Sequence, residues 1–410
     1  MIKKTLLALV LLSTFAACQN DEGGSSTDPK PRKDIPLSRA EAKLTDESTE
    51  FAFRFFKQVN GSEQKEPNWM VSPFSASLAL GMITNGAAGN TLVEMQNTLG
   101  FSTSSLDEMN AYNQKLTAAL LDLDNTTQLG IANSIWIKQG FKIYDSFIEV
   151  NKKMYDAQVQ NLDFASPTAP DVINAWCAEK TNNCIDKVIE GIPETMRIYL
   201  LNALYFKGIW TDKFDKSNTR PEQFTNEDGT SSQVQMMNQT GTFNFTTNDF
   251  FSIAEFPYGN EAFSMVVLLP VKGKTLDESL RDLTYDNWKV WNEGMVSHSL
   301  NVKFPRFELK YEKKLTEDME AMGMMDAFIS DKADFSAMSS AELFIGLLEQ
   351  YTYIKVDEEG TEAAAVTVVG GLTTSVPSNP DDFYMDRPFV FMIKEKSTGT
   401  ILFMGKVTKL

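Results

Sequence analysis

The sequence predicts an α+β fold with large antiparallel or mixed β-sheets. Segments with helical periodicity cluster early in the chain, while runs of β-branched and aromatic residues cluster late. No internal repeat is found in the sequence. The 410 residues are 42% hydrophobic and 23% charged, which is typical of a folded protein and allows a large core. The length fits one large domain or two to three ordinary ones.

Apolar residues at helical spacing predict the helices. Phe51, Phe55 and Phe56 recur between charged residues in segment 39–59, which indicates an amphipathic first helix. A second helix is expected to begin at Ser72-Pro73, and the small residues of 72–89 favour close packing in the core. Further helices are predicted over 105–121, 169–179, 276–291 and 314–322.

Strands are predicted where β-branched and aromatic residues follow one another. The predicted strands cover 129–137, 199–210, 263–269, 300–309, 351–356, 388–392 and 401–407.

Charge and histidine content exclude several classes of function. Lys and Arg number 38 against 55 Asp and Glu, and the net charge of −17 repels nucleic acid. The only histidine, His298, rules out metal sites built on two histidines, and its polar neighbours predict an exposed imidazole. We expect neither a metal nor a cofactor.

The motifs of enzymes are incomplete. Gly273-Lys274-Thr275 resembles the end of a phosphate-binding loop but lacks the glycine five residues earlier, so an ordinary turn is expected. No GxSxG nucleophile motif occurs. The neighbours Glu358 and Glu359 would point to opposite sides of an extended chain, which makes them a poor acid–base pair. The sequence therefore does not predict an enzyme.

Residues 1–17 have the features of a secretory signal. Lys3 and Lys4 precede an apolar run that ends at Cys18, and the run is shorter than the roughly 20 residues that span a membrane. The stretch resembles the lipobox of bacterial lipoproteins, in which Cys18 becomes the acylated N-terminus. A plain signal peptide with a chance cysteine is the alternative. Residues 18–37 would form a flexible polar tether. Gln19 favours the outer membrane and leaves the cell-surface and periplasmic orientations open.

Two further cysteines, Cys177 and Cys184, are not expected to form a disulfide. If one helix carried both, their Cα atoms would lie about 10 Å apart, beyond the reach of the bond. The fold must then be held together by packing.

Segment 358–377 (EEGTEAAAVTVVGGLTTSVP) has an unusual composition. It is rich in Ala, Thr, Val and Gly and has no charge after Glu362. These side chains suit a strand, yet the segment lies where a loop is expected, and so long a loop is usually functional. A flexible linker is the alternative, although linkers normally contain more Ser, Pro and charge. If the segment forms a strand, its side chains alternate between two faces, and one face is small and uncharged. That face consists of Thr361, Ala363, Ala365, Thr367 and Val369.

Residues 356–365 strongly resemble the reactive-loop hinge of inhibitory serpins, the serine protease inhibitor superfamily. Other segments are similar to serpin signatures in the same order, namely 68–80 (NWMVSPFSASLAL), 200–210 (LLNALYFKGIW), 333–336 (ADFS), 387–391 (RPFVF) and 403–407 (FMGKV). The resemblance covers residues 38–410. It implies helices packed around three β-sheets, with a large central sheet and an exposed reactive loop at about 358–380. The matching hinge residues are Glu358, Glu359, Gly360, Thr361, Glu362, Ala363, Ala364 and Ala365.

The sequence departs from the family at two places. Segment 181–185 (TNNCI) replaces the family's Thr-x-Gly-Lys-Ile, and Gln350 replaces a histidine of the family's shutter cluster. The resemblance implies that the Gln350 amide makes that histidine's hydrogen bond near Asn202. Trp210 would lie at the top of the sheet, where the loop enters. Ordinary core burial is the alternative for each member of the implied cluster, Ser72, Ser75, Asn202 and Gln350.

The resemblance implies a monomeric suicide inhibitor of serine endopeptidases, with cysteine endopeptidases left open as further targets. The protease would form an acyl-enzyme on the loop, and the freed hinge would insert into the central sheet as a strand, for which serpins are an established example. A non-inhibitory serpin that carries a ligand or acts as a chaperone is the alternative. It would favour a charged, bulky or proline-containing hinge.

The scissile bond is predicted at Thr374-Ser375, fourteen residues after Gly360. Counting back from 387–389 gives Pro377-Ser378, a poorer choice because few serine proteases cleave after proline. No Lys or Arg occurs over 360–386, which favours elastase-like or subtilisin-like targets over trypsin-like ones. The alternative reactive positions are Leu372, which leaves room for chymotrypsin-like enzymes, Thr373, Pro377 and Ser378.

Overall fold

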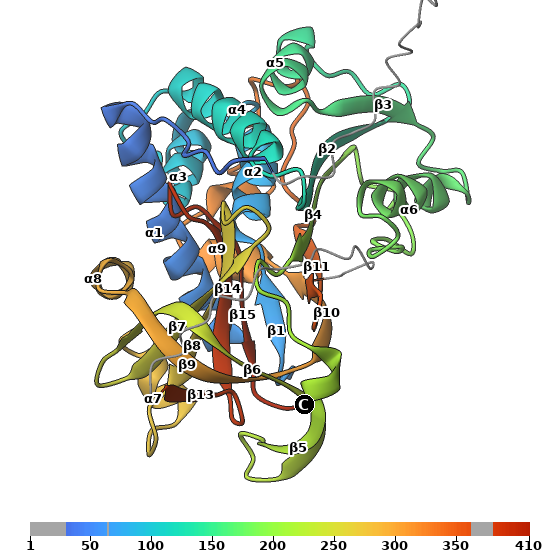
Figure 1. Cartoon of the computed structure of the whole chain (residues 1–410). Coiled ribbons are helices and arrows are strands. Elements are labelled where there is room, and N and C mark those ends of the chain that lie inside the picture. Colours follow the sequence, from blue (N-terminus) through green and yellow to red (C-terminus); the bar gives the residue numbers. More distant parts are fainter. Residues whose placement is uncertain (1–29, 64, 362–379) are drawn as a thin grey trace, which may run out of the picture.

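The computed structural model describes residues 30–63, 65–361 and 380–410 (Figure 1). Within these ranges, none of the helices combines the length and apolar character needed to cross a membrane. The helices are α1 (Arg39–Ser62), α2 (Pro73–Thr84), α3 (Gly89–Leu99), α4 (Leu106–Asp122), α5 (Asp145–Tyr155), α6 (Ala169–Lys180), α7 (Leu276–Leu280), α8 (Tyr285–Glu293) and α9 (Thr316–Ala321), with the 3-10 turns η1 (Lys216–Asn218) and η2 (Asp326–Phe328).

The central sheet has six strands in the order β10-β11-β12-β4-β2-β3. The two-residue β12 pairs antiparallel with β11 on one side and with β4 on the other. The strands are β2 (Gln128–Lys138), β3 (Gln158–Leu162), β4 (Ile198–Ile209), β10 (Phe307–Lys314), β11 (Glu349–Asp357) and β12 (Gly360–Thr361).

A second sheet has nine strands, with eight in the order β1-β15-β14-β8-β7-β6-β9-β13 and β5 paired to β6. The 17-residue β6 pairs with β5, β7 and β9, so hydrogen bonding joins two of the three expected sheets into one. The strands are β1 (Trp69–Val71), β5 (Arg220–Thr225), β6 (Ser231–Thr247), β7 (Phe251–Tyr258), β8 (Phe263–Pro270), β9 (Val296–Pro305), β13 (Asp381–Tyr384), β14 (Phe389–Glu395) and β15 (Ile401–Val407).

Helix α2 lies in the core and contacts both β4 and β15. Its small side chains allow this close packing, as predicted. Ser72 caps its first turn by accepting a hydrogen bond from Ser75 N, and Pro73 occupies the first helical position. The Ser72 hydroxyl also donates to the carbonyl of Leu402 at 2.7 Å, which ties the helix to β15.

Helix α6 covers the opposite face of the central sheet beside β2 and β4 (Figure 1). Trp176 of α6 packs edge-to-face on Trp136 of β2, with ring centroids 6.3 Å apart, and forms a second apolar core. The helix ends at Lys180, before Cys184, so one helix does not carry both cysteines. Cys177 and Cys184 are both free thiols in the structure.

The α+β fold class is confirmed, and several element boundaries differ from the predictions. The predicted helix 72–89 ends at Thr84, and segment 276–291 forms two helices because Thr284 begins a new one as a side-chain cap. The predicted strand 300–309 is divided at Arg306, where the chain passes from the second sheet into the central one. His298 is half-exposed, as expected, and its Nε2 lies 2.7 Å from a carboxylate oxygen of Asp381.

Residues 30–37, which the sequence places in the flexible tether, lie against the domain. The Ile35 side chain is buried, and the Ile35 amide donates to the Ser397 hydroxyl at 2.9 Å. The Lys30 amide donates to Asn125 Oδ1 at 2.8 Å. Burial of Ile35 and these hydrogen bonds hold this part of the predicted tether on the surface.

Candidate functional site

The predicted hinge begins inside the central sheet. Gly360 pairs with Asp357 of β11 and Ile209 of β4, and Thr361 pairs with Val356 and Gly208. Gly360 has a φ of 149°, and a Cβ there would lie 1.9 Å from the carbonyl oxygen of Gly208. Only glycine tolerates this backbone and this contact. The first two residues of β12 are therefore already held between β11 and β4.

Thr361 points into the core, as the alternation of the segment predicted. Its side chain is 1% exposed, and its hydroxyl lies 2.5 Å from the hydroxyl of Tyr258. The Tyr258 ring stacks on Trp210 with centroids 4.4 Å apart and planes at 10°. A Cβ on Gly208 would lie 2.6 Å from the Tyr258 ring, so Gly208 makes room for it. Burial raises the pKa of Tyr258, which keeps its phenol protonated.

Trp210 follows β4 and lies beside the turn between β11 and β12. Its indole Nε1 donates to the carbonyl of Asp357 at 2.9 Å, and its backbone amide donates to the carbonyl of Glu359 at 2.9 Å. The ring is buried against Phe256 and Phe304 of the second sheet. Trp210 thus connects the turn between β11 and β12 to the aromatic core.

Glu358 is one of two adjacent glutamates that are held by different cations. Its carboxylate is 2% exposed, accepts from Arg306 Nε at 2.9 Å and also accepts from the Thr219 hydroxyl. Burial alone would raise the pKa of Glu358, but the hydrogen bonds from Arg306 and Thr219 outweigh burial and lower it.

Glu359 pairs with Lys213 at 2.7 Å and Lys216 at 2.9 Å, and the hydrogen bonds from these lysines lower its pKa. The contacts of the described residues therefore give Glu358 and Glu359 different partners.

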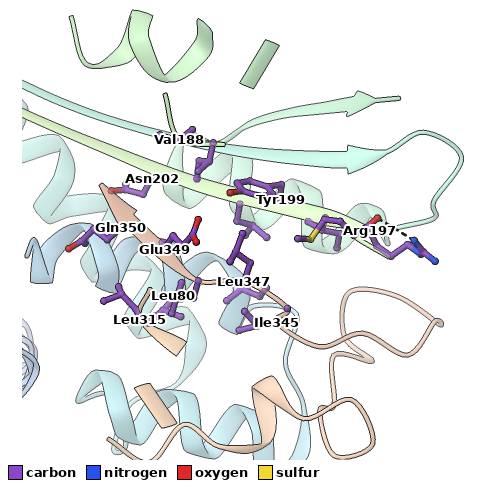
Figure 2. A pocket seen from close by; sticks show the side chains of 18 of the residues that line it. Leu80, Val188, Arg197, Tyr199, Asn202, Leu315, Ile345, Leu347, Glu349 and Gln350 are labelled. Carbon is purple, nitrogen blue, oxygen red and sulfur yellow. Dashed lines mark hydrogen bonds between the residues drawn. The ribbon is translucent and has the colours of Figure 1, made fainter. Parts of the chain in front are cut away.

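A cavity of about 560 Å³ extends below β12, between β4 and β11 (Figure 2). Tyr199 and Asn202 of β4 face it from one side, while Glu349 and Gln350 of β11 face it from the other. Over the described residues, only Gly360 and Thr361 connect β4 to β11 by strand pairing. Among the residues that the structure describes, no strand lies between β4 and β11 along this cavity.

The predicted shutter cluster comes together at this cavity, but its hydrogen bonds differ from the expectation. The Gln350 amide accepts from Ser72 N and donates to Ser72 O, both at 2.8 Å. Asn202 Nδ2 instead donates to Asn133 Oδ1 at 2.7 Å, and its own Oδ1 is buried without a partner among the described residues. The expected Gln350–Asn202 bond is thus wrong, because both ends of the Gln350 amide are occupied by the start of α2. Ser75, Asn202 and Gln350 all line the cavity.

Residues 46–410 match the sequence model of the family described as "Serpin (serine protease inhibitor)". The chain is a serpin. An uncharacterized serpin-like protein of Thermococcus kodakarensis is 32% identical over 388 residues, which cover 93% of this chain and 89% of that protein.

Solved serpin structures have the same fold. The thermophilic serpin Tengpin in its native state has a TM-score of 0.83 and 31% identity, covering 93% of this chain and 97% of Tengpin. Human thyroxine-binding globulin, solved in complex with thyroxine, has a TM-score of 0.81 and 25% identity, covering 90% of this chain and 99% of that one.

Part of the predicted serpin site lies outside the described residues, and part of the observed site was not predicted. No group of metal-ligating side chains occurs among residues 30–63, 65–361 and 380–410.

The sequence did not predict the roles of Tyr258, Arg306 and Lys213. Each belongs to a strand or turn distant in sequence from the hinge, and only the folded sheets bring them together. The predicted residues outside the described ranges are Cys18, Glu362, Ala363, Ala364, Ala365, Leu372, Thr373, Thr374, Ser375, Pro377 and Ser378.

Proposed function

We propose that this serpin is a suicide inhibitor of serine endopeptidases. The observation that carries the proposal is β12, because its two residues lie between β4 and β11 above an open cavity. A protease that attacks the Thr374 carbonyl would form an acyl-enzyme and release Ser375 as the new amino terminus. The freed segment can then extend β12 downward, with the protease still attached at Thr374.

The register of β12 predicts which residues would meet during insertion. Thr361 pairs with Val356 of β11 and Gly208 of β4. If the antiparallel register continues, each following loop residue would pair with the preceding residue of β11 and of β4. Six residues after Thr361, Thr367 would then lie between Gln350 and Asn202. The Thr367 hydroxyl can then donate to Asn202 Oδ1, which has no described partner.

Insertion can supply enough free energy to disorder a protease. Roughly ten ladder hydrogen bonds at about 0.5–1.5 kcal/mol each give a gain comparable with the ~5–15 kcal/mol that stabilises a typical domain. Burial of the apolar loop face adds to this gain.

A ligand carrier is the second candidate, since human thyroxine-binding globulin has the same fold and was solved with its hormone. The hinge favours inhibition instead, because Thr361 is uncharged, small and already accommodated in the sheet. The two functions separate on an SDS gel after mixing with an elastase-like protease. A stable covalent complex supports inhibition. Clean loop cleavage without a complex supports the carrier, and turnover of small substrates would indicate an enzyme.

The preferred target is an elastase-like or subtilisin-like enzyme. No Lys or Arg lies between Gly360 and Asp386, so the loop offers no cationic side chain to the acidic pocket of a trypsin-like enzyme. Mass spectrometry of the C-terminal peptide released by a panel of proteases identifies the scissile bond. Efficient complexes with trypsin and none with elastase would refute this preference.

We also propose that Cys18 carries lipid and anchors the protein at the bacterial outer membrane. The charged, apolar and small residues that precede Cys18 support this proposal. One acyl chain binds a membrane only marginally, whereas two or more anchor stably.

A further inference from the structure

The chain leaves the described domain close to the hinge. The carbonyl of Lys30 accepts from Asn260 Nδ2 at 3.1 Å. The neighbouring Gly259 amide donates to the carbonyl of Ile209 at 2.8 Å, and Ile209 pairs with Gly360. A short series of direct contacts therefore connects Lys30 to the base of the reactive loop.

A second set of contacts places Lys30 at the same end of the central sheet. Its ammonium pairs with Asp122 at 2.8 Å, and its amide bonds to Asn125 Oδ1, just before β2. β2 begins at Gln128, which pairs with Lys207 of β4. The next residue of β4, Gly208, pairs with Thr361. Asn125 and Asn260 thus lie at the end of the sheet where β12 enters.

The segment after Lys30 is held along the surface. The carbonyl of Pro36 accepts from Lys115 Nζ at 2.8 Å, and Ile35 is buried with its amide on Ser397. A pull on the N-terminus therefore acts on the domain at Lys30 and not at the start of α1.

The length of chain before Lys30 limits how far this end can move from a lipid anchor. Eleven residues lie between Cys18 and Lys30. Even fully extended, the twelve steps from Cα to Cα span only about 40 Å. A protease of ordinary size has a radius of gyration of about 17 Å and is therefore roughly 45 Å across. A protease that reaches the loop must therefore lie at the membrane surface beside the tether, a thin layer that a dissolved protease has to enter and a membrane-attached protease already occupies.

We propose that the anchored serpin holds the loop-bearing end of its central sheet toward the membrane, and that its target is a protease attached to the same membrane surface. This inference rests on the proposed inhibitory function and on the proposed anchor. A protease on that surface meets the loop at a high effective concentration. Loop insertion along the 12 residues of β4 would then carry the trapped protease about 40 Å away from the membrane.

Energy transfer from a labelled serpin to acceptor-labelled lipids tests the orientation. Single fluorophores are placed on Asp212→Cys, beyond the loop-bearing end of β4, or on Glu194→Cys, before its other end; both positions are exposed. Cys184→Ser removes the partly exposed thiol, whereas Cys177 is buried. The full-length lipidated protein is bound to phosphatidylethanolamine–phosphatidylglycerol vesicles that contain a headgroup-labelled acceptor.

We expect at least twofold greater transfer from position 212 than from position 194. The matched Cys18→Ser proteins should show no transfer from either label. Equal transfer, or greater transfer from position 194, would overturn the proposal. Failure of the Cys18-containing protein to bind vesicles would also overturn it, through loss of the anchor.

Rates of complex formation test the partner. On vesicles, a dissolved elastase should react several-fold more slowly than it does with Cys18→Ser protein in solution, and 24 Gly/Ser residues inserted after Asn20 should restore the rate. The same elastase tethered by a lipid to the vesicles should react at least tenfold faster than the dissolved enzyme. Equal rates in every arrangement would refute the membrane-facing geometry but not the inhibitory function. No complex with the Cys18→Ser protein in solution would refute the inhibitory function itself.

Discussion

Gly360 and Thr361 determine where the missing strand of the central sheet begins. Gly360 allows the chain to pass within contact distance of Gly208, and Thr361 then bonds to Tyr258 beneath Trp210. Both residues are buried. In the proposed mechanism, the residues that follow Thr361 are the ones offered to a protease.

Gly360→Ala is expected to displace β12 and destabilise the intact protein. The new Cβ would overlap the Gly208 carbonyl, and the positive φ adds strain, for a cost of about 1–3 kcal/mol. The midpoint of guanidinium unfolding measures this effect. Gly191→Ala is the control, because nothing lies within 4 Å of a Cβ at that position. Unchanged midpoints for both variants would contradict the close packing at Gly360.

The Glu358 carboxylate is expected to stabilise the hinge in a pH-dependent way. Its pKa is lowered below the usual glutamate value of 4.5, so its contribution to stability is fully present above that pH and is lost as the pH falls through the folded-state pKa. Glu358→Gln should therefore cost about 1.5–3 kcal/mol at pH 7, and the difference should shrink toward pH 3.

Unfolding midpoints of parent and Glu358→Gln proteins between pH 7 and pH 3 test this expectation. Glu190→Gln is the control, since Glu190 lies in an exposed pair with Lys187 and should matter little at any pH. A cost for Glu358→Gln that stays constant over the whole range would contradict the assigned ion pair.

At the scale of elements, β4 and β11 are joined by strand pairing over the described residues only through β12. β10 and β11 pair over eight positions, and β4 pairs with β2 over ten positions, while the two residues of β12 lie at the top of the space between β4 and β11. The cavity below it is lined by side chains of both neighbouring strands. A strand added there would find hydrogen-bonding partners on both sides.

Cleavage of the reactive loop is expected to stabilise the protein. An inserted strand adds roughly ten ladder hydrogen bonds, which contribute about 5–15 kcal/mol. The cleaved chain should therefore melt at a much higher temperature than the intact chain in differential scanning calorimetry. Identical melting of the two forms would show that the cavity does not accept the loop.

Local sequence patterns predicted the elements with strong periodicity. The first helix follows from the spacing of its apolar side chains, α2 from its Ser72-Pro73 start and small residues, and β4 from its β-branched and aromatic residues. β6 escaped prediction because it is long, polar in part and shared between sheets. The hinge was predictable from its own residues, whereas the Arg306–Glu358 pair and the Tyr258–Thr361 contact depend on strands that only tertiary structure brings together.

At the scale of the whole molecule, we propose that the lipid anchor holds the serpin domain at a membrane, where its reactive loop meets the protease. The described domain is acidic in a chain of net charge −17, so attraction to anionic lipid does not hold it at a membrane. Membrane association would then depend on the acyl chains of Cys18.

Cys18→Ser is expected to release the protein from the membrane fraction. Without acylation, the acidic domain is expected to bind lipid too weakly for stable association. Fractionation of cells followed by immunoblotting measures the partition, and Gln19→Ala serves as a neighbouring control that keeps the cysteine. Unchanged membrane association of the Cys18→Ser protein would contradict the lipid anchor.

The fraction of SDS-stable complex formed by Thr361→Arg with an elastase-like protease tests the insertion mechanism most directly. An arginine at this buried position would leave an unpaired charge beside Tyr258, so insertion should slow and the acyl-enzyme should hydrolyse first. Glu362→Arg is the matched control, because strand alternation places that side chain on the opposite face. We expect Thr361→Arg to be cleaved as a substrate with little stable complex, and Glu362→Arg to inhibit nearly as well as the parent. Full inhibition by Thr361→Arg, or equal failure of both variants, would contradict insertion in the register of β12.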